Sequence, residues 1–504
     1  MNDKIIFWLT NSVINFGVAK FIQEKLDCKI FGIADIVNKQ KAFYENQQFV
    51  KLQKIWYLHD HILKTRNKPD LKYLSYIEEK YKINLWLLAY NERIFYRFND
   101  FHKFSSNEVL SILEQECKFF ESVLEEVKPN FVIMGITVFH HDHIFYEMCK
   151  AQGIKILTLK PTNFGYRFMI SDGSEIADIK NYENTNITIT ELQNYLKGFD
   201  PAKQREELKK TFQNSKINYF KAALQFLLSS NNNIKTHYTY FGRTKFNVVI
   251  KMLVYTIKKR YREFFMNRKL NHKITDSYPF VYFPLHIEQE SVLLIGAPFY
   301  TNQVEVITNI VKSLPVGYKL LVKEHPIMAL RGWRSTSTYK KIMELPNVEL
   351  LHPTVNADEI LKKCSLVITI SGTAGLEAAF YQKAAITFVD TNYSILPSVH
   401  KLKSIEELPQ AIRTSLKKEV KLSDLSKYVN LIHDNSFECD IQALGTAMQN
   451  YFHYGGFLVD VDISIEKMNS FLEEYRSTFE LIASKFIKKI EQIKNSNLNT
   501  KINN

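Results

Sequence analysis

The sequence has few cysteines and no long apolar run. Its five cysteines, Cys28, Cys117, Cys149, Cys364 and Cys439, are scattered without CxxC spacing, which argues against a disulfide framework or a structural zinc site. No apolar run approaches the roughly 18 residues that are needed to span a bilayer, and the first residues lead directly into a predicted strand rather than a signal peptide. We therefore expect a cytoplasmic protein with reduced, buried thiols.

Two common nucleotide signatures are also missing. The chain has neither the lysine of a P-loop nor the full GxGxxG of a dinucleotide fold, which disfavours ATP hydrolysis and NAD chemistry. What is present is a small-residue turn, Ser371-Gly372-Thr373-Ala374-Gly375, between an apolar strand and a helix. Free backbone N–H groups at a helix start attract a phosphate, and Glu377, one turn later, can reach ribose hydroxyls. The turn alone is weak evidence, because a purely structural turn has the same composition.

A second polar motif, Lys323-Glu324-His325-Pro326, follows another apolar strand. Pro326 restricts His325 to extended backbone geometry, so we expect the imidazole to project over the edge of the sheet. There it can donate a hydrogen bond to a phosphate oxygen of a leaving group, with Lys323 adding positive charge. The alternative is that Glu324 and His325 only cap the loop. Because ligands bind at the carboxyl ends of strands in open α/β sheets, the two motifs together predict a nucleotide or nucleotide-sugar pocket.

The length and the order of elements predict an α/β protein with two domains. Of the 504 residues, 45% are hydrophobic and 24% are charged, which is typical of a globular protein. We predict an N-terminal Rossmann-like domain over 1–240, a basic helical segment over 241–273, a second Rossmann-like domain over 279–404, and C-terminal helices with a tail over 405–504. Within the first domain, residues 38–104 show no regular periodicity.

The second domain has the clearest pattern, in which apolar runs alternate with helical periodicity and so favour a parallel sheet. Its predicted strands are Phe280 to Pro284, Lys319 to Val322, Val348 to Leu351, Leu366 to Ile370 and Ala385 to Phe388.

Positive charge is concentrated in one segment. The net charge is +13, and between Phe241 and Lys273 there are ten lysines or arginines and one acid, Glu263. Its apolar residues fall on one face of a helix. Either residues 243–269 lie on anionic lipid headgroups, or the apolar face packs on the protein itself, which we favour because ordinary surface helices share the pattern. A nucleic-acid partner is disfavoured, because the aromatic residues are not interleaved with the charges.

The second domain resembles the capsule polysaccharide biosynthesis family, which contains bacterial transferases that use CMP-activated acidic sugars such as Kdo. The resemblance covers about Pro279 to Pro397 and rests on Phe283-Pro284-Leu285-His286, Glu288 to Glu290, Gln303 and the two motifs above. It implies a GT-B-like fold, in which two Rossmann-like domains face a cleft. The donor binds the C-terminal lobe and the acceptor the N-terminal lobe, with no cofactor and no essential metal.

The resemblance also implies residue roles. His325, Ser371 and Thr373 correspond to contacts with the donor nucleotide and its phosphate, and Glu377 resembles the acid that contacts the ribose. The remaining expected donor-binding residues are Lys323, Pro326, Gly372 and Gly375. Gly372 departs from the family pattern, in which a second hydroxyl residue is often expected, and this leaves the donor base and sugar open.

The acceptor side needs a group that takes the acceptor proton in an inverting transfer. His140, His141 and Asp142, just after the strand that ends at Gly135, are the best-placed candidates, and Asp172 is a second candidate that equally suits an ordinary turn. The histidines also look metal-like. Because adjacent residues cannot all face one ion from a single helix turn, we predict no metal site.

We therefore expect a metal-independent glycosyltransferase that moves a sugar from a nucleotide-sugar donor to a surface or capsular polysaccharide or a glycolipid, at the inner face of the plasma membrane. The alternatives are a GT-B-fold nucleotide-sugar epimerase, a polyol-phosphate transferase, and a non-catalytic partner in capsule assembly or export. An epimerase needs neither an acceptor cleft nor a membrane helix, and a non-catalytic partner binds nucleotide without consuming a donor.

Overall fold

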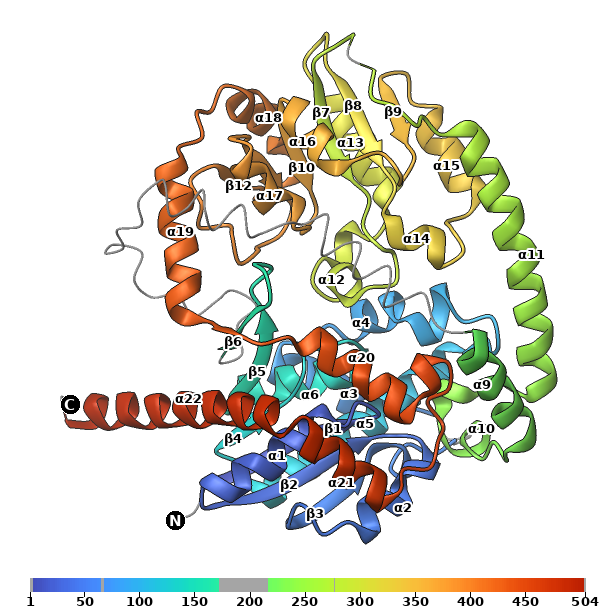
Figure 1. The fold of residues 1–504 in the computed structure, drawn as a ribbon, viewed down its shortest axis with the longest axis vertical. Helices are drawn as coiled ribbons and strands as arrows, with labels where there is room; N and C mark the ends of the chain where they lie inside the picture. Colours follow the sequence, from blue (N-terminus) through green and yellow to red (C-terminus); the bar gives the residue numbers. More distant parts are fainter. Residues whose placement is uncertain (1–2, 65–67, 172–215, 276, 503–504) are drawn as a thin grey trace.

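A computed structural model of the chain describes residues 3–64, 68–171, 216–275 and 277–502. It shows two α/β lobes, one above the other in Figure 1, each built around a mainly parallel sheet.

The sheet of the N-terminal lobe has the strand order β13-β6-β5-β4-β1-β2-β3. Its strands are β1 (Asp3–Thr10), β2 (Cys28–Asp35), β3 (Leu52–Tyr57), β4 (Phe131–Ile133), β5 (Lys155–Pro161), β6 (Arg167–Ser171) and β13 (Phe437–Glu438). The strands from β5 to β3 run parallel, while β6 is antiparallel to β5 and β13 to β6. The centre of β1 is an unbroken apolar run because both faces of a parallel sheet are covered by helices.

The helices of this lobe follow the usual alternation with the strands. They are α1 (Ile14–Lys25), α2 (Asn38–Asn46), α3 (Leu71–Tyr81), α4 (Leu85–Asn91), the π-helical turn η2 (Arg93–Arg97), α5 (Ser106–Val127) and α6 (His140–Ala151). Helix α5 begins at a capping box, in which the Ser105 hydroxyl accepts the N–H of Glu108 and the Glu108 carboxylate accepts the N–H of Ser105.

The sheet of the C-terminal lobe has the order β12-β11-β10-β7-β8-β9, with every paired strand parallel. Its strands are β7 (Phe280–Pro284), β8 (Lys319–Lys323), β9 (Val348–Leu351), β10 (Leu366–Thr369), β11 (Ala385–Thr387) and β12 (Val399–Lys401). In chain order within the lobe this is 6-5-4-1-2-3, which is the Rossmann arrangement with its switch point between β7 and β10. The predicted strands of this domain are confirmed.

Helices cover both faces of this second sheet. They are α12 (Ser291–Leu294), α13 (Gln303–Ser313), α14 (Pro326–Leu330), α15 (Thr336–Met343), α16 (Ala357–Lys363), α17 (Ala374–Phe380) and α18 (Leu408–Leu416). The apolar side chains of the sheet form two buried clusters, one on each face.

The end of the chain returns to the N-terminal lobe. Helix α19 (Leu422–Asn435) leads away from the upper lobe, β13 then joins the lower sheet, and three helices follow: α20 (Ile441–Phe452), α21 (Ile465–Glu474) and α22 (Arg476–Ile502). Phe479 of α22 stacks on Phe21 of α1 with ring centroids 6.0 Å apart. A side chain at Gly17 would overlap the Phe479 ring, so the glycine permits this close approach. The four-part division of the chain stays a prediction, and the structure adds that residues from β13 onward pack on the N-terminal lobe.

The lobes meet along one side of each sheet. Arg93 donates a hydrogen bond to the carbonyl of Gln289 (3.1 Å), and Asn91 donates one to the carbonyl of Pro298 (3.2 Å). At this junction a hollow of about 220 Å³ is lined by Arg97 from the lower lobe and by Glu288 and other residues from the upper lobe. Two facing Rossmann-like lobes with C-terminal helices confirm the predicted GT-B-like architecture.

Helix α11 (Lys245–Lys269) runs along the outer edge of both lobes in Figure 1, after the shorter α9 (Lys216–Leu228). Within the described part of α11, Met266 is the one fully buried residue. This differs from the favoured prediction that the apolar face packs on the protein. No helix among the described residues is both long and apolar enough to cross a membrane.

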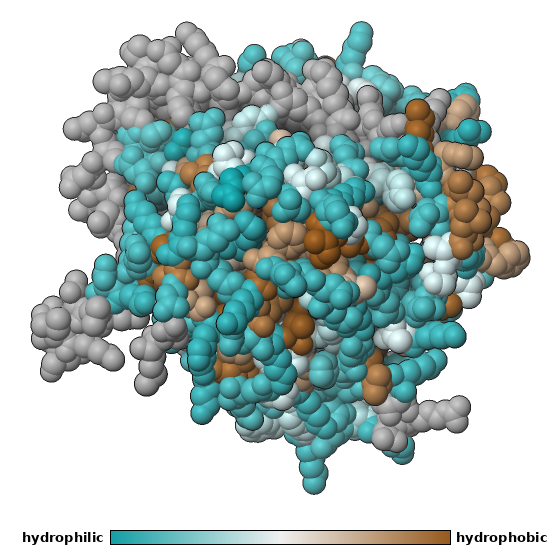
Figure 2. Space-filling model, turned by 60° about the horizontal axis from the view of Figure 1, so that its bottom comes forward, coloured by the Kyte–Doolittle hydropathy of each residue, from teal (hydrophilic) through white to brown (hydrophobic). Residues whose placement is uncertain are grey.

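The side of α11 that touches the protein is mixed. Met266 and Phe265 pack on the apolar core of the C-terminal lobe, and polar side chains join them. Lys259 donates to the carbonyl of Leu330 (3.0 Å), and Arg262 donates to the carbonyls of Gly332 (3.2 Å) and Trp333 (2.9 Å). At 3.6 residues per turn, the outward side of the helix is lined by apolar residues. The most exposed of them are Phe246 (73%), Ile257 (69%) and Phe264 (65%). Figure 2 shows a hydrophobic cluster at its right edge, the side on which Figure 1 places α11.

Candidate functional site

The two sequence motifs of the C-terminal lobe lie at the same edge of its sheet. Lys323 to Pro326 follow β8, Ser371 to Gly375 follow β10, and β7 lies between these two parallel strands. Because neighbouring strands are about 4.8 Å apart, the two loops start roughly 10 Å from each other. In Figure 1 the helices that follow β7 and β8, α12 and α14, lie on the side of the upper lobe that faces the lower lobe. The motifs therefore share one edge at the switch point of the sheet.

His286, at the end of β7, connects the two loops. Its Nε2 accepts the N–H of Ser371 (3.2 Å), and its backbone is held by Gln303, whose amide accepts the His286 N–H (2.7 Å) and donates to the His286 carbonyl (3.0 Å). Burial, and after it the nearby charge of Arg334, lower the pKa of His286 to about 3, so the ring is neutral. With Nε2 accepting, the proton is on Nδ1, which is buried without a hydrogen-bond partner among the described residues.

The glycines of the turn are required by its close contacts. A Cβ at Gly372 would lie 2.8 Å from Thr369 Oγ1 and 3.2 Å from His286 Nε2, and a Cβ at Gly375 would lie 2.7 Å from the Tyr393 hydroxyl. Tyr393 in turn donates a hydrogen bond to the carbonyl of Gly372. The absence of a hydroxyl residue at position 372 therefore has a steric reason in this chain.

The other members of the turn are more accessible. The hydroxyl of Thr373 is exposed and donates to Glu377 Oε1 (3.0 Å), which holds the carboxylate beside the start of α17. Ser371 is partly buried, and its Oγ has no hydrogen-bond partner among the described residues. An unpaired buried hydroxyl costs free energy unless a ligand satisfies it.

His325 has the extended backbone that Pro326 predicts, with φ −71° and ψ 132°, and it caps α14. Its Nδ1 accepts the N–H of Ile327 (3.2 Å), so the neutral ring carries its proton on Nε2. Burial, against the opposing pull of Glu324, lowers the pKa of His325 to about 4. The imidazole is therefore a neutral hydrogen-bond donor near pH 7.

Glu324 is buried and organises the edge from inside. Its carboxylate accepts from Arg334 Nε (2.7 Å), from the Tyr339 hydroxyl (2.5 Å) and from the N–H of His325 (2.6 Å). Arg334 also pairs with Glu288 (3.1 Å) and donates to the carbonyl of His286. Burial opposes the charge of Arg334, but Glu324 and Glu288 outweigh it and raise the pKa of Arg334. This buried pair holds the loop of His286 against the loop of His325.

Lys323 ends β8 as a largely buried side chain, whereas Pro326 is partly exposed at the first position of α14. Burial and the nearby His272 lower the pKa of His352, which follows β9, and Lys323 adds a smaller effect. The lysine thus lies near the neighbouring strand β9 as well as the loop of His325.

The acceptor-side candidates lie at the start of α6. Of these, His140 and His141 are each 1% exposed, and Asp142 is 6% exposed. His140 Nδ1 is 2.8 Å from Glu92 Oε2, and His141 Nε2 is 3.0 Å from Asp35 Oδ2. Both imidazoles are thus bonded inside the lobe.

Asp142 differs from the two histidines because its carboxylate accepts from the loop before the helix. The N–H groups of Val138 (2.9 Å) and Phe139 (3.0 Å) donate to it, and Val138 is exposed. Burial raises the pKa of Asp142 to about 7, although His141 and the two N–H groups act against this rise. The remaining candidate, Asp172, lies outside the described residues.

Several residues that organise the sites are marked by no sequence pattern. Arg334 and Tyr339 follow the motif Lys323 to Pro326, and no periodic pattern of apolar residues marks them as buried. Tyr393 lies in an irregular loop after β11. Glu116 is an acid on the buried, apolar face of α5, one turn from Leu113 and Phe120. In contrast, His286 and Gln303 belong to the motifs that carried the family resemblance, so that signal was available.

Residues 190–428 match the family described as "Capsule polysaccharide biosynthesis protein". This match confirms the recognised resemblance over that segment, which contains both motifs of the C-terminal lobe. No curated protein sequence matches the chain.

Solved structures with distant likeness include UDP-GlcNAc 2-epimerase from Methanocaldococcus jannaschii, at 13% identity and a TM-score of 0.25, covering 84% of this chain and 94% of that one. Another is the beta Kdo 2,7 transferase KpsC of Thermosulfurimonas dismutans, at 10% identity and a TM-score of 0.30, covering 62% of this chain and 79% of that one. Likenesses this distant assign no function.

Proposed function

From the match of residues 190–428 to the capsule polysaccharide biosynthesis family, we propose that the chain is a glycosyltransferase. It moves a sugar from a nucleotide-sugar donor, in our proposal a CMP-activated acidic sugar, to a surface or capsular polysaccharide or a glycolipid. The observation that carries the proposal is the meeting of the two family motifs around His286 at the switch point of the C-terminal sheet. Ligands of open α/β sheets bind at such a point.

On the donor side, His325 and Ser371 contact the phosphate. His325 offers a neutral Nε2–H, because Nδ1 is occupied by Ile327, and Ser371 offers a hydroxyl without a partner among the described residues. A positioned donor that strengthens its hydrogen bond as charge develops on the leaving phosphate lowers the barrier. Lys323 adds positive charge from the same edge.

The turn itself shapes the nucleotide site. Gly372 and Gly375 let the backbone approach a ligand closely, Thr373 adds an exposed hydroxyl, and Glu377 is positioned by Thr373 to accept from ribose hydroxyls. Pro326 fixes the direction of the His325 loop. Together these residues form the proposed donor site.

On the acceptor side, we assign the proton-accepting role to Asp142. Of the three candidates in α6, it alone is hydrogen-bonded to the exposed loop that precedes the helix. His140 and His141 are committed to carboxylates inside the lobe, so they position α6 rather than contact the acceptor. Asp172 stays the second candidate.

The enzyme works at an anionic membrane surface in this proposal. Helix α11 turns a row of apolar residues outward, while Met266, Lys259 and Arg262 hold the C-terminal lobe. Helix α9 adds exposed apolar residues beside it, and a hollow of about 520 Å³ lies between the two helices. Apolar insertion flanked by lysine and arginine is the physical basis of interfacial binding to anionic lipids.

The test is a transfer assay on the full chain with CMP- and UDP-sugars and a glycolipid acceptor, in which released nucleotide and glycosylated product are both identified by mass spectrometry. We expect an acceptor-dependent product. His325→Ala should lower the rate by roughly 100-fold, and His400→Ala, on a partly exposed histidine of β12 outside the site, should not.

Other outcomes would overturn the proposal in distinguishable ways. Conversion of the free nucleotide-sugar to its epimer without an acceptor product would indicate an epimerase. Nucleotide binding with no consumption of any donor would indicate a non-catalytic assembly partner.

A further inference from the structure

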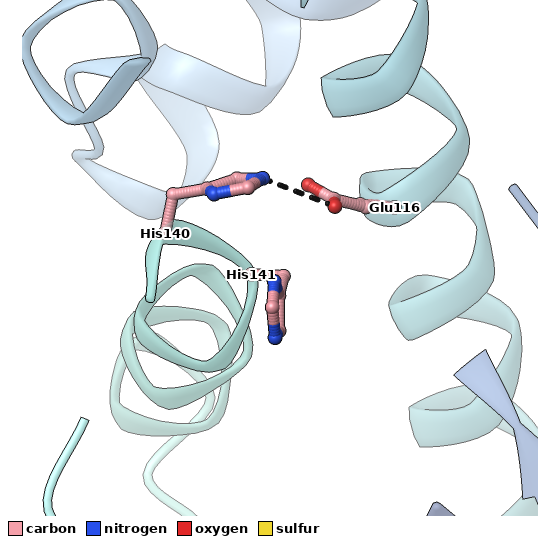
Figure 3. Close-up of side chains that lie close together, drawn as sticks. All are labelled: Glu116, His140 and His141. Atoms are coloured by element: carbon pink, nitrogen blue, oxygen red, sulfur yellow. Dashed lines mark hydrogen bonds and ion pairs between the residues drawn. The ribbon is translucent and has the colours of Figure 1, made fainter. Parts of the chain in front are cut away.

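A second polar cluster lies inside the N-terminal lobe, away from the donor site. Glu116 of α5 and His140 and His141 of α6 each offer one side-chain ligand atom, and these atoms all lie within 4.8 Å of one another. Figure 3 shows the two imidazoles on the first turn of α6, on the side that faces Glu116. All three residues are buried, with exposures of 1% or less. A buried group of imidazoles and a carboxylate needs a reason, because such groups are costly to remove from water.

Each imidazole points one nitrogen into the cluster and the other at a carboxylate. His140 turns Nε2 to Glu116 Oε1 (3.1 Å) and Nδ1 to Glu92 (2.8 Å). His141 turns Nδ1 into the cluster and Nε2 to Asp35 (3.0 Å). A carboxylate behind each imidazole is the outer-shell arrangement of metal-binding histidines, because it fixes the tautomer and raises the basicity of the ligand nitrogen.

The Tyr238 hydroxyl closes the cluster as a fourth oxygen. It lies 2.9 Å from Glu116 Oε1, 3.4 Å from His140 Nε2 and 3.1 Å from His141 Nδ1. In a tetrahedral zinc site with bonds of about 2.0–2.1 Å, neighbouring ligand atoms are about 3.3 Å apart. Four of the distances among these atoms, from 2.9 to 3.4 Å, are therefore close to the spacing in such a site, and the ligand atoms of Glu116, His140 and His141 all lie within 4.8 Å of one another.

One oxygen of this cluster is left without a hydrogen bond. When the imidazoles donate, their N–H groups and the hydroxyl proton of Tyr238 account for the contacts among the four ligand atoms. The second carboxylate oxygen, Glu116 Oε2, is buried with no hydrogen-bond partner among the described residues. The carboxylates of Glu92 and Asp35 lie directly behind the rings. A cation bound among the four ligand atoms would satisfy Glu116 Oε2 and offset the negative charge of the carboxylates.

The sequence pattern argued against a metal because neighbours on a helix point in different directions. The structure shows how two adjacent histidines serve one point: His140 uses the distal nitrogen of its ring, Nε2, and His141 uses the proximal one, Nδ1. The third ligand comes from another helix, while Asp142 caps α6 and takes no part.

We propose that Glu116, His140, His141 and Tyr238 bind a structural zinc ion. Imidazole and carboxylate ligands, four in number, suit a tetrahedral Zn²⁺ ion. With a fourth protein ligand no position is left open for substrate, so the ion ties α5, α6 and the segment that leads to α11 together. This inference is independent of the proposed transferase reaction, which uses the other lobe.

The test measures metal directly on the full chain. The protein is treated with EDTA, dialysed, loaded with Zn²⁺ or Co²⁺, freed of excess metal by gel filtration and measured by inductively coupled plasma mass spectrometry. We expect one metal per chain, a tetrahedral Co²⁺ absorption spectrum, and a lower melting temperature for the EDTA-treated protein. Glu116→Gln should lose the metal, whereas the control His143→Asn, on the same helix but outside the cluster, should retain it.

A milder variant keeps the test decisive if Glu116→Gln fails to fold. Glu92→Gln leaves all four ligands in place and should weaken zinc binding by roughly 10–100-fold while full loading is still reached at high zinc concentration. The proposal is overturned if the loaded protein carries no metal, or if Co²⁺ gives an octahedral spectrum. In the metal-free case, His140 is a protonated imidazole held between Glu92 and Glu116.

Discussion

Glu324 shows how a single buried carboxylate can position a surface site. It accepts hydrogen bonds from Arg334, Tyr339 and the backbone of His325, and Arg334 carries the contact on to the His286 carbonyl. The two central residues of the motif Lys323 to Pro326 therefore have different roles. Glu324 is buried and fixes the loops by hydrogen bonds, and His325 is held by it at the edge of the sheet.

This arrangement predicts a large cost for removing one partner of the buried ion pair. Arg334→Met leaves Glu324 as an unpaired buried charge, and we expect a loss of about 3–5 kcal/mol in the free energy of unfolding, measured by urea denaturation. The control is Lys401→Met, which breaks the exposed pair with Asp390 and should cost about 1 kcal/mol or less. Equal losses in the two variants would contradict the role given to Arg334.

At the residue scale, the sequence predicted His325, Ser371 and the two glycines as neighbours at one edge, because polar motifs after parallel strands must share it. It did not predict Arg334 or Tyr339. Which residues hydrogen-bond to Glu324 depends on the three-dimensional fold, and no local pattern marks an arginine in an irregular loop as buried.

At the scale of elements, α11 is the least expected result. Its apolar stripe was clear from the sequence, but periodicity alone does not tell whether a stripe faces the protein or away from it. The hydrogen bonds of Lys259 and Arg262 to the loop around Gly332, together with the buried Met266, settle this orientation.

We predict that the outward face of α11 is needed for membrane binding and not for folding. The triple variant Phe246→Gln, Ile257→Gln and Phe264→Gln should keep the melting temperature of the wild type, because these side chains are exposed. It should lose sedimentation with vesicles that contain anionic lipid. Phe299→Gln, at an exposed phenylalanine elsewhere, is the control. Equal sedimentation of the triple variant and the wild type would remove the membrane proposal.

Strands of the second lobe were predicted well because a parallel strand covered on both faces is a continuous apolar run. Residues 38–104 were not predicted well, since β3 shows no alternation of apolar and polar residues and both α4 and η2 are short. Two-residue β13 carries no strand signal at all.

At the scale of the whole molecule, the end of the chain packs against its beginning. Strand β13 and helices α20 to α22 complete the lobe that the first 170 residues begin, and their apolar residues share one buried cluster with β1 and α1. Local sequence patterns predicted helices here but not their partner, because contacts across more than 400 residues leave no periodic trace.

This closure predicts that the C-terminal helices stabilise the N-terminal lobe. Phe479→Ala, in the contact of α22 with α1, should lower the free energy of unfolding by about 3–5 kcal/mol in urea denaturation. Phe299→Ala should change it by less than about 0.5 kcal/mol, since that ring is exposed. A small effect of Phe479→Ala would mean that α22 is not part of the lobe's core.

The proposed donor site requires that the two motifs of the C-terminal lobe contact one ligand. Calorimetric titration of CMP and UDP into the wild type, His325→Ala, Ser371→Ala and the double variant measures this directly. We predict that the wild type binds one of the nucleotides and that each single variant binds it about tenfold more weakly. The loss in the double variant should differ from the sum by at least about 0.5 kcal/mol, because both groups contact the same phosphate. Undiminished binding in either single variant would contradict the shared site.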